Sequence, residues 1–111
     1  MRHCALLVEG DTLTVFYTNV GEPPPERILV ASIDLRGDWM AWRQSESSVV
    51  LEPERDYEGA DLPLAASMRG EITQRARQLR DPGVYEEGSR IYLCYSVAGE
   101  SGIAIAEMHR A

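Results

Sequence analysis

Apolar and polar residues alternate in two short stretches, "LTVFYT" at 13–18 and "IYLCYS" at 91–96. Both are rich in aromatic and β-branched side chains, a pattern that predicts β-strands. The glycine-containing segments just before them, 9–12 and 87–90, predict hairpin turns that follow a short first strand. The chain is therefore expected to be all-β and antiparallel. Two further apolar segments predict third strands: residues 27–35 and 101–108.

The two strand groups form an internal repeat. Superposing Gly10 on Gly88, 78 residues later, places Arg2 on Arg80 and His3 on Asp81. After a longer loop in the first copy, which contains three prolines, the third strands align as Val30 on Ile103 and Ala31 on Ala104. The central strands match at alternate positions: Leu13, Val15 and Tyr17 fall on Ile91, Leu93 and Tyr95.

The first copy continues beyond its third strand. A turn at 36–38 leads into "WMAWRQSE" at 39–46, which is predicted as a fourth strand. The repeat is then a four-stranded antiparallel meander, complete in the first copy and stopping after three strands in the second. Repeated meanders of this kind are the blades of β-propellers.

At 111 residues the chain is long enough for one domain. We divide it into a first blade at 1–50, a connecting segment at 51–78 and an incomplete second blade at 79–111. Residues 71–78 fit either a short helix, from the spacing of Ile72, Ala76 and Leu79, or an arginine-rich loop.

The second copy resembles one group of propellers. Arg80-Asp81-Pro82, the acidic turn 86–88 and the aromatic strand 91–96 are similar to blades of five-bladed propeller glycoside hydrolases of the arabinanase, xylosidase and fructosidase type. The resemblance covers about two-thirds of the chain and matches the C-terminal part of such a protein. It implies that Asp81 corresponds to an aspartate that serves as general base, nucleophile or transition-state stabiliser.

The resemblance and the repeat together suggest candidate site residues. Asp81 is the candidate catalytic carboxylate, although an Asp before Pro also caps turns through its side-chain oxygens. Arg80 could bind a carboxylate or a sugar hydroxyl, or be an ordinary salt-bridged side chain. His3 occupies the position of Asp81 in the other copy, so Arg2, His3, Arg80 and Asp81 are expected to share one cleft if the inner-strand ends line it. A surface role for His3 stays open.

A second candidate cluster lies in "EPERDYEGADLP" at 52–63. Asp61 is a second candidate catalytic carboxylate, while Glu58 and Tyr57 are candidate sugar-binding residues. Gly59 could let the backbone approach a ligand closely. Alternatively, these acidic residues are ordinary solvent-exposed side chains of a surface loop with no binding role.

Composition removes several function classes. The net charge of −7 argues against nucleic-acid binding. No apolar run approaches the ~20 residues of a membrane span, and we expect no membrane partner. Cys4 and Cys94 lack metal-ligand spacing, so free thiols in a reducing cytoplasm are expected. We expect no cofactor and no metal site.

Two functions follow as hypotheses. The first is a glycoside-hydrolase-like partial propeller that binds carbohydrate without catalysing hydrolysis, because hydrolysis needs two carboxyl groups across the sugar. The second is a non-catalytic module for self-assembly or partner binding. The strand 102–108 has an unpaired edge, and the stacked blades have outer faces that a full propeller would cover. A homo-oligomer is therefore expected, most simply a two-fold dimer, formed through this edge, the blade faces, or both. The expected core contains the alternate residues of both central strands, together with Ile103, Ile105 and four aromatic residues: Trp39, Trp42, Tyr92 and Tyr95.

Overall fold

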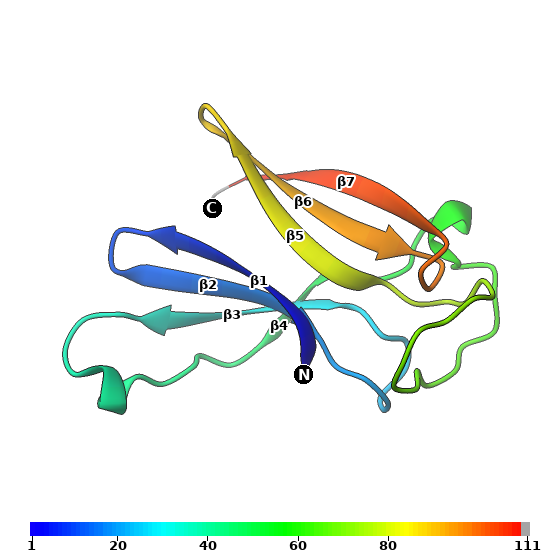
Figure 1. The fold of residues 1–111 in the computed structure, drawn as a ribbon, viewed down its shortest axis with the longest axis horizontal. Coiled ribbons are helices and arrows are strands. Elements are labelled where there is room, and N and C mark those ends of the chain that lie inside the picture. Colours follow the sequence, from blue (N-terminus) through cyan, green and yellow to red (C-terminus); the bar gives the residue numbers. More distant parts are fainter. Residues whose placement is uncertain (110–111) are drawn as a thin grey trace.

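The computed structural model describes residues 1–109, which fold into two antiparallel sheets (Figure 1). The strands of each sheet follow one another in chain order, and consecutive strands pair. This confirms the predicted all-β architecture of one four-stranded and one three-stranded meander. Sheet A contains β1 (Arg2–Glu9), β2 (Thr12–Thr18), β3 (Ile28–Asp34) and β4 (Ser48–Leu51), and sheet B contains β5 (Arg80–Glu87), β6 (Arg90–Val97) and β7 (Gly102–Met108).

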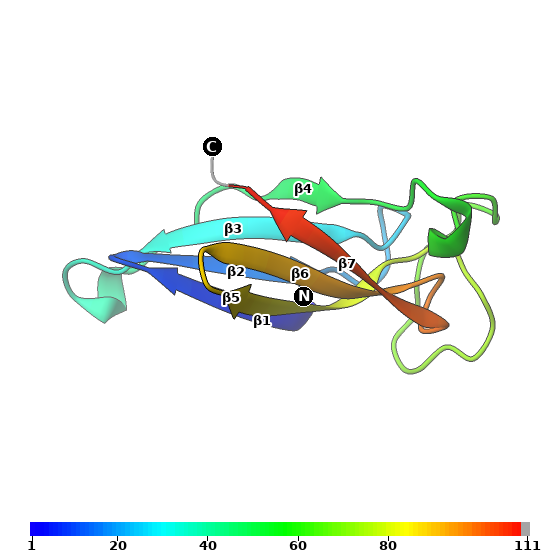
Figure 2. The same cartoon turned by 90° about the horizontal axis from the view of Figure 1, so that it is seen from above.

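The two sheets stack with β1 and β5 beside each other, and β5 and β6 overlie β1 and β2 in Figure 2. We call the faces that meet the inner faces and the opposite ones the outer faces. Because side chains alternate along a strand, each strand contributes one row to each face. The inner rows form one hydrophobic core, whose buried members are Leu7, Phe16, Ile28, Leu79, Ile91, Leu93, Tyr95 and Val97.

The repeat is visible in the strand pairing, with one adjustment. Leu6 pairs with Val15 in sheet A just as Val84 pairs with Leu93 in sheet B, which keeps the spacing of 78 residues. Val15 also pairs with Ala31, however, whereas Leu93 pairs with Ala106. The third strands therefore correspond at a spacing of 75, and the sequence alignment of Ala31 with Ala104 is wrong by two residues.

The fourth strand of sheet A lies later in the chain than predicted. Residues 39–46 contain the 3-10 helix η1 (Trp39–Ala41) rather than a strand. Asp38 starts this turn by accepting a hydrogen bond from the Met40 backbone N–H at 3.0 Å. The chain then forms a single bridge between Gln44 and Ile33 before β4 begins at Ser48.

Part of the expected core is on the surface. Ile103 and Ile105 are 84% and 61% exposed because their row of β7 belongs to the outer face of sheet B. Trp39 is 68% exposed and Trp42 is also exposed, since η1 projects from the end of sheet A. Leu13, Val15 and Tyr92 are half-buried, whereas Tyr17, Ile91, Leu93 and Tyr95 are buried as predicted.

The segment between the sheets is irregular. It contains the 3-10 helix η2 (Asp56–Glu58), and residues 71–78 form a loop, so the helical alternative for them is wrong. Leu79 ends this segment in the core and donates its backbone N–H to the Glu26 carbonyl at 2.9 Å.

In residues 1–109 no helix has the length and apolar character needed to cross a membrane.

Candidate functional site

The first strands of the two sheets carry matching irregularities. The register shifts between Arg2 and Ala5 in β1 and between Arg80 and Gly83 in β5. Inside these bulges His3 and Asp81 adopt left-handed backbone conformations, with φ of 54° and 51°. A non-glycine residue pays about 1–2 kcal/mol for this conformation, so each must be held by its surroundings. The sequence repeat that aligned His3 with Asp81 thus corresponds to a structural equivalence.

The bulges bring the two side chains together. His3 Nδ1 lies 2.7 Å from Asp81 Oδ1, and the Ser96 hydroxyl donates to Asp81 Oδ2 at 3.1 Å. The side chains of His3 and Asp81 remain 34% and 43% exposed. The structure therefore places this carboxylate at the surface with both oxygens oriented, as expected if the strand ends share a cleft.

Behind this pair lies a buried charged cluster centred on Glu26. The Arg2 guanidinium donates to both carboxylate oxygens of Glu26, from Nη2 at 2.6 Å and from Nε at 3.0 Å. Arg80 Nε lies 3.6 Å from the same carboxylate, whose side chain is completely buried. Burial alone would raise the pKa of Glu26, but hydrogen bonds from Arg2 and then from Thr18 and Ser67 lower it overall.

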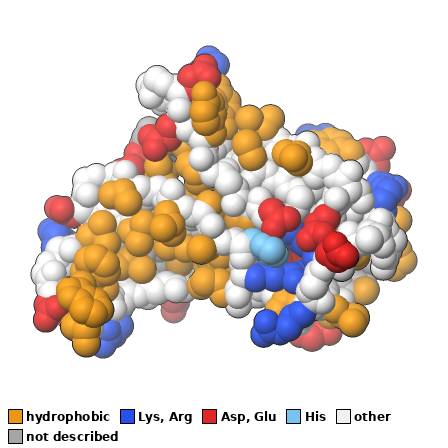
Figure 3. Space-filling view, in the orientation of Figure 1, with side chains coloured by type: hydrophobic (Ala, Val, Ile, Leu, Met, Phe, Trp, Pro, Cys, Tyr) orange, Lys and Arg blue, Asp and Glu red, His pale blue; other side chains and the backbone are white. Residues whose placement is uncertain are grey.

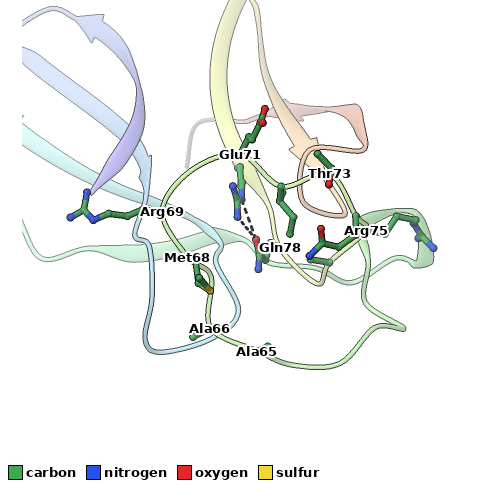
Figure 4. Close-up of a pocket in the computed structure, with 12 residues that line it drawn as sticks. Ala65, Ala66, Met68, Arg69, Glu71, Thr73, Arg75 and Gln78 are labelled. Carbon is green, nitrogen blue, oxygen red and sulfur yellow. Dashed lines mark hydrogen bonds between the residues drawn. The ribbon is translucent and has the colours of Figure 1, made fainter.

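Arg80 is committed to the interior and cannot reach a ligand at the surface. It is 1% exposed, and its Nε and Nη2 donate to the Gln78 side-chain oxygen at 3.1 and 2.7 Å (dashed in Figure 4). Its Nη1 donates to the Gly70 carbonyl at 3.1 Å and lies 3.4 Å from Glu100. The sequence interpretation of Arg80 as a sugar-binding residue is therefore corrected to a structural role.

These contacts close the connecting segment into a ring. Residues 65–78 curl around a cavity, as Figure 4 shows. The cavity has a volume of about 370 Å³, and Gln78 and Arg80 are among the residues that line it. Because the polar atoms of the Arg80 guanidinium are already paired, the cavity presents no free cation from this residue. The ring instead anchors the segment on the start of β5.

A second, shallow depression of about 520 Å³ opens beside Asp81 on the outer side of sheet B. Its lining adds Ser96, Glu100, Ser101 and Ile103 to the aspartate. Glu100 is partly committed, since its Oε2 accepts the Ile72 backbone N–H at 3.2 Å and its Oε1 faces Arg80. Asp81 is thus the carboxylate of this depression that offers oriented oxygens to a ligand.

Glu58, predicted to bind sugar, is buried. Its Oε1 accepts the backbone N–H groups of Glu54 and Arg55 at 3.0 Å each, and its Oε2 accepts the Tyr95 hydroxyl at 2.8 Å. Burial, and next the Glu58 carboxylate, raise the pKa of Tyr95. Glu58 therefore holds the η2 turn against β6, and its proposed contact with a ligand is corrected.

The other two candidates of that segment, Asp61 and Tyr57, are exposed and do not line the depression beside Asp81. Tyr57 lines a neighbouring depression, which shares Ser101, Gly102 and Ile103 with it. Gly59 does permit a close approach, but to the chain itself: a Cβ there would lie 2.4 Å from the Ala76 carbonyl oxygen. The two candidate carboxylates, Asp61 and Asp81, do not form one site.

Sequence reasoning missed three residues that organise the site. Glu26 follows three prolines in a loop and has no motif that marks it as buried. Ser96 could have been found, because it aligns with Thr18 in the repeat and both hydroxyls bond to the first strand of their sheet. Glu100 aligns with Glu22 in the repeat, but that alignment did not indicate its contact with Arg80. No three His, Cys, Asp or Glu side chains gather in a metal-binding arrangement within residues 1–109.

Comparisons with known proteins give a relative without a described role. The chain is 42% identical over 109 residues to the uncharacterized protein R118 of Acanthamoeba polyphaga mimivirus. The aligned region covers 97% of this chain and 30% of that protein, so more than twice as much of the viral protein lies outside it. No family model matches the chain. No solved structure matches it either.

Proposed function

We propose that the chain is a non-catalytic carbohydrate-binding module of the propeller glycoside hydrolase type, which binds its ligand in the depression beside Asp81. The observation that carries this proposal is the pair of left-handed residues, His3 and Asp81, whose side chains meet at the surface. Left-handed non-glycine residues are retained where the surrounding structure enforces them, and they concentrate at ligand sites. The resemblance to glycoside hydrolases supports a sugar as the ligand.

The chemistry of the depression suits a polyhydroxylated molecule. A carboxylate with both oxygens oriented accepts hydrogen bonds from adjacent sugar hydroxyls, and bonds to a charged group contribute about 1.5–3 kcal/mol each. His3 and Ser96 fix the direction of these oxygens in advance, which lowers the entropy lost on binding. Ile103 adds an exposed apolar wall for the C–H face of a ring.

Hydrolysis is not supported by the same geometry. It requires a second carboxyl group about 5–9.5 Å away, acting as acid or base. Glu26 is completely buried between two arginines, and Glu100 holds Arg80 and the Ile72 backbone. Both groups are engaged in maintaining the fold, so we assign the module to binding.

The test is a titration of ¹⁵N-labelled protein with arabino-, xylo- and fructo-oligosaccharides, followed by NMR. We expect one of these series to cause saturable shifts at residues 81, 96 and 101–103. Asp81→Asn should weaken binding about tenfold, the loss of one charged hydrogen bond, whereas the matched control Asp61→Asn should leave affinity unchanged. Shifts confined to the Asp61 loop, or none with any series, contradict the proposal.

A separate assay checks that the module does not hydrolyse its ligand. We expect aryl arabinosides, xylosides and fructosides to be cleaved no faster than in buffer. Turnover that disappears in Asp81→Asn would show that this carboxylate is catalytic and would overturn the assignment to binding alone.

A further inference from the structure

Both outer faces expose apolar side chains. On sheet A, Leu6 and Val8 of β1 are 57% and 61% exposed, and on sheet B, Ile103 and Ile105 of β7 are exposed as described above. Figure 3 shows hydrophobic side chains gathered at the η1 end of sheet A and again over sheet B. Contiguous exposed apolar surface of this kind marks interaction sites.

The core of the molecule shows which face of one sheet packs against which face of the other. It is formed by the inner face of sheet A, where Phe16 and Val30 pair across neighbouring strands, and the inner face of sheet B, where Leu93 pairs with Ala106. The two contributing faces are different. One sheet uses its Phe16–Val30 side, and the other uses the side that carries Leu93 and Ala106.

Because the two sheets are repeats, the outer face of sheet B corresponds to the inner face of sheet A, and the outer face of sheet A corresponds to the inner face of sheet B. The equivalents of Phe16 and Val30 are Cys94 and Ile105, which pair on the outer face of sheet B. The equivalents of Leu93 and Ala106 are Val15 and Ala31, which pair on the outer face of sheet A beside Leu6. The repeat therefore places a second copy of each half of the internal interface on an outer face. On sheet A the exposed apolar members of that face include Leu6 and Val8, since Val15 is half-buried and Ala31 is buried.

We propose that a second copy of this chain places the outer face of its sheet A on the outer face of sheet B of the first, repeating the internal packing head to tail. The occupant follows from continuity with the internal interface, because the face needed to cover Cys94 and Ile105 is the one that carries Val15 and Ala31. The contact is heterologous, so an added copy exposes the same two faces again unless a ring of two or more copies closes.

This arrangement differs from a dimer held by one contact across a two-fold axis. Such a contact would join the outer face of sheet A to itself, or that of sheet B to itself, whereas two copies joined by two head-to-tail contacts form a closed ring that also has two-fold symmetry. Neither combination occurs inside the molecule, whose internal contact joins unlike faces. The structure thus favours unlike faces between copies as well.

The test uses two variants, each of which blocks one face with a charge. Leu6→Glu disrupts the outer face of sheet A and Ile105→Glu that of sheet B; both positions are exposed, so the variants should remain folded, which circular dichroism verifies. Leu64→Glu, on the exposed connecting segment, is the matched control. Masses are measured by sedimentation equilibrium at equal micromolar concentrations.

Head-to-tail packing makes a specific prediction for mixing. The control oligomerises as the unmodified chain does, and each face variant alone is a monomer, since every contact needs both faces. An equimolar mixture of the two face variants forms a one-to-one dimer, in which the intact face of each meets that of the other. A face variant that still dimerises alone indicates a two-fold contact, and oligomers that resist both substitutions indicate pairing along the β7 edge. Either of these two results overturns the proposal. So does a mixture of the two face variants that stays monomeric, or an unmodified chain that is itself a monomer.

Discussion

Glu26 is the residue on which the junction of the two sheets depends most. It is contributed by the loop before β3, yet it pairs with arginines at the starts of β1 and β5. Removing one partner of a buried ion pair costs about 3–5 kcal/mol because the remaining charge is uncompensated. The sequence showed Arg2 and Arg80 as equivalent residues but could not show their shared partner, since this contact depends on the path of a proline-rich loop.

Glu26→Gln should lower the free energy of unfolding at neutral pH by about 3 kcal/mol, measured by urea denaturation. The matched control is Glu52→Gln, which removes an exposed pair with Arg27 and should cost less than about 1 kcal/mol. A loss for Glu26→Gln as small as that of the control would mean that the buried cluster contributes little to stability.

The lowered pKa of Glu26 also predicts a pH dependence. The carboxylate is stabilised in the folded state, so its contribution is present above its unfolded pKa of about 4.3 and is lost as the pH falls through the lower folded pKa. The unmodified protein should therefore lose stability on acidification below about pH 4.3, and Glu26→Gln should lose less over the same range. Parallel acid titrations of the two proteins would contradict the assignment.

At the scale of elements, the alternation of apolar and polar residues correctly predicted the strands of both hairpins. The strand predicted after β3 is not observed, because a 3-10 turn forms there. The segment 39–46, which contains Trp39 and Trp42, is predicted as a strand, but the Asp38 side chain caps the Met40 N–H and starts a 3-10 turn. An alternating pattern predicts which residues share one face of a sheet, but it does not predict which of the two faces is buried. Ile103 and Ile105 alternate as a buried row would, and only the stacking of the sheets shows that their row faces outward.

The core of sheet B gives a direct test of the strand packing. Leu93 is completely buried between the sheets, so Leu93→Ala should cost about 2–5 kcal/mol in unfolding free energy. Leu64→Ala removes the same atoms from an exposed position and should cost less than about 0.5 kcal/mol. A loss below about 1 kcal/mol for Leu93→Ala would contradict the position of β6 in the core.

The connecting segment depends on a close approach at Gly59. Both Gly59 and Gly37 have positive φ, 90° and 83°, but only a Cβ at Gly59 would meet the backbone, at the Ala76 carbonyl oxygen. Gly37→Ala should cost about 1 kcal/mol from conformation alone, and Gly59→Ala should cost clearly more. Equal losses in thermal denaturation would show that the segment can move away from the turn at no cost.

At the scale of the whole molecule, the two sheets are versions of one unit, and each unit has two unlike faces. One contact between unlike faces forms the core, and the same pair of faces recurs on the outside, where Leu6 and Val8 of sheet A and Ile103 and Ile105 of sheet B are exposed. The His3–Asp81 contact lies where the first strands of the two units meet. The depression beside Asp81 is lined by Cys94 and Ile103 of the outer face of sheet B, so in the proposed assembly sugar and the next copy compete for this face.

The most direct test is the mass of the unmodified chain, measured by sedimentation equilibrium across a hundredfold range of concentration. The repeated use of unlike faces predicts that the mass rises above that of one chain as concentration increases, until closed rings of two or more copies accumulate. A mass that stays at one chain throughout would contradict it.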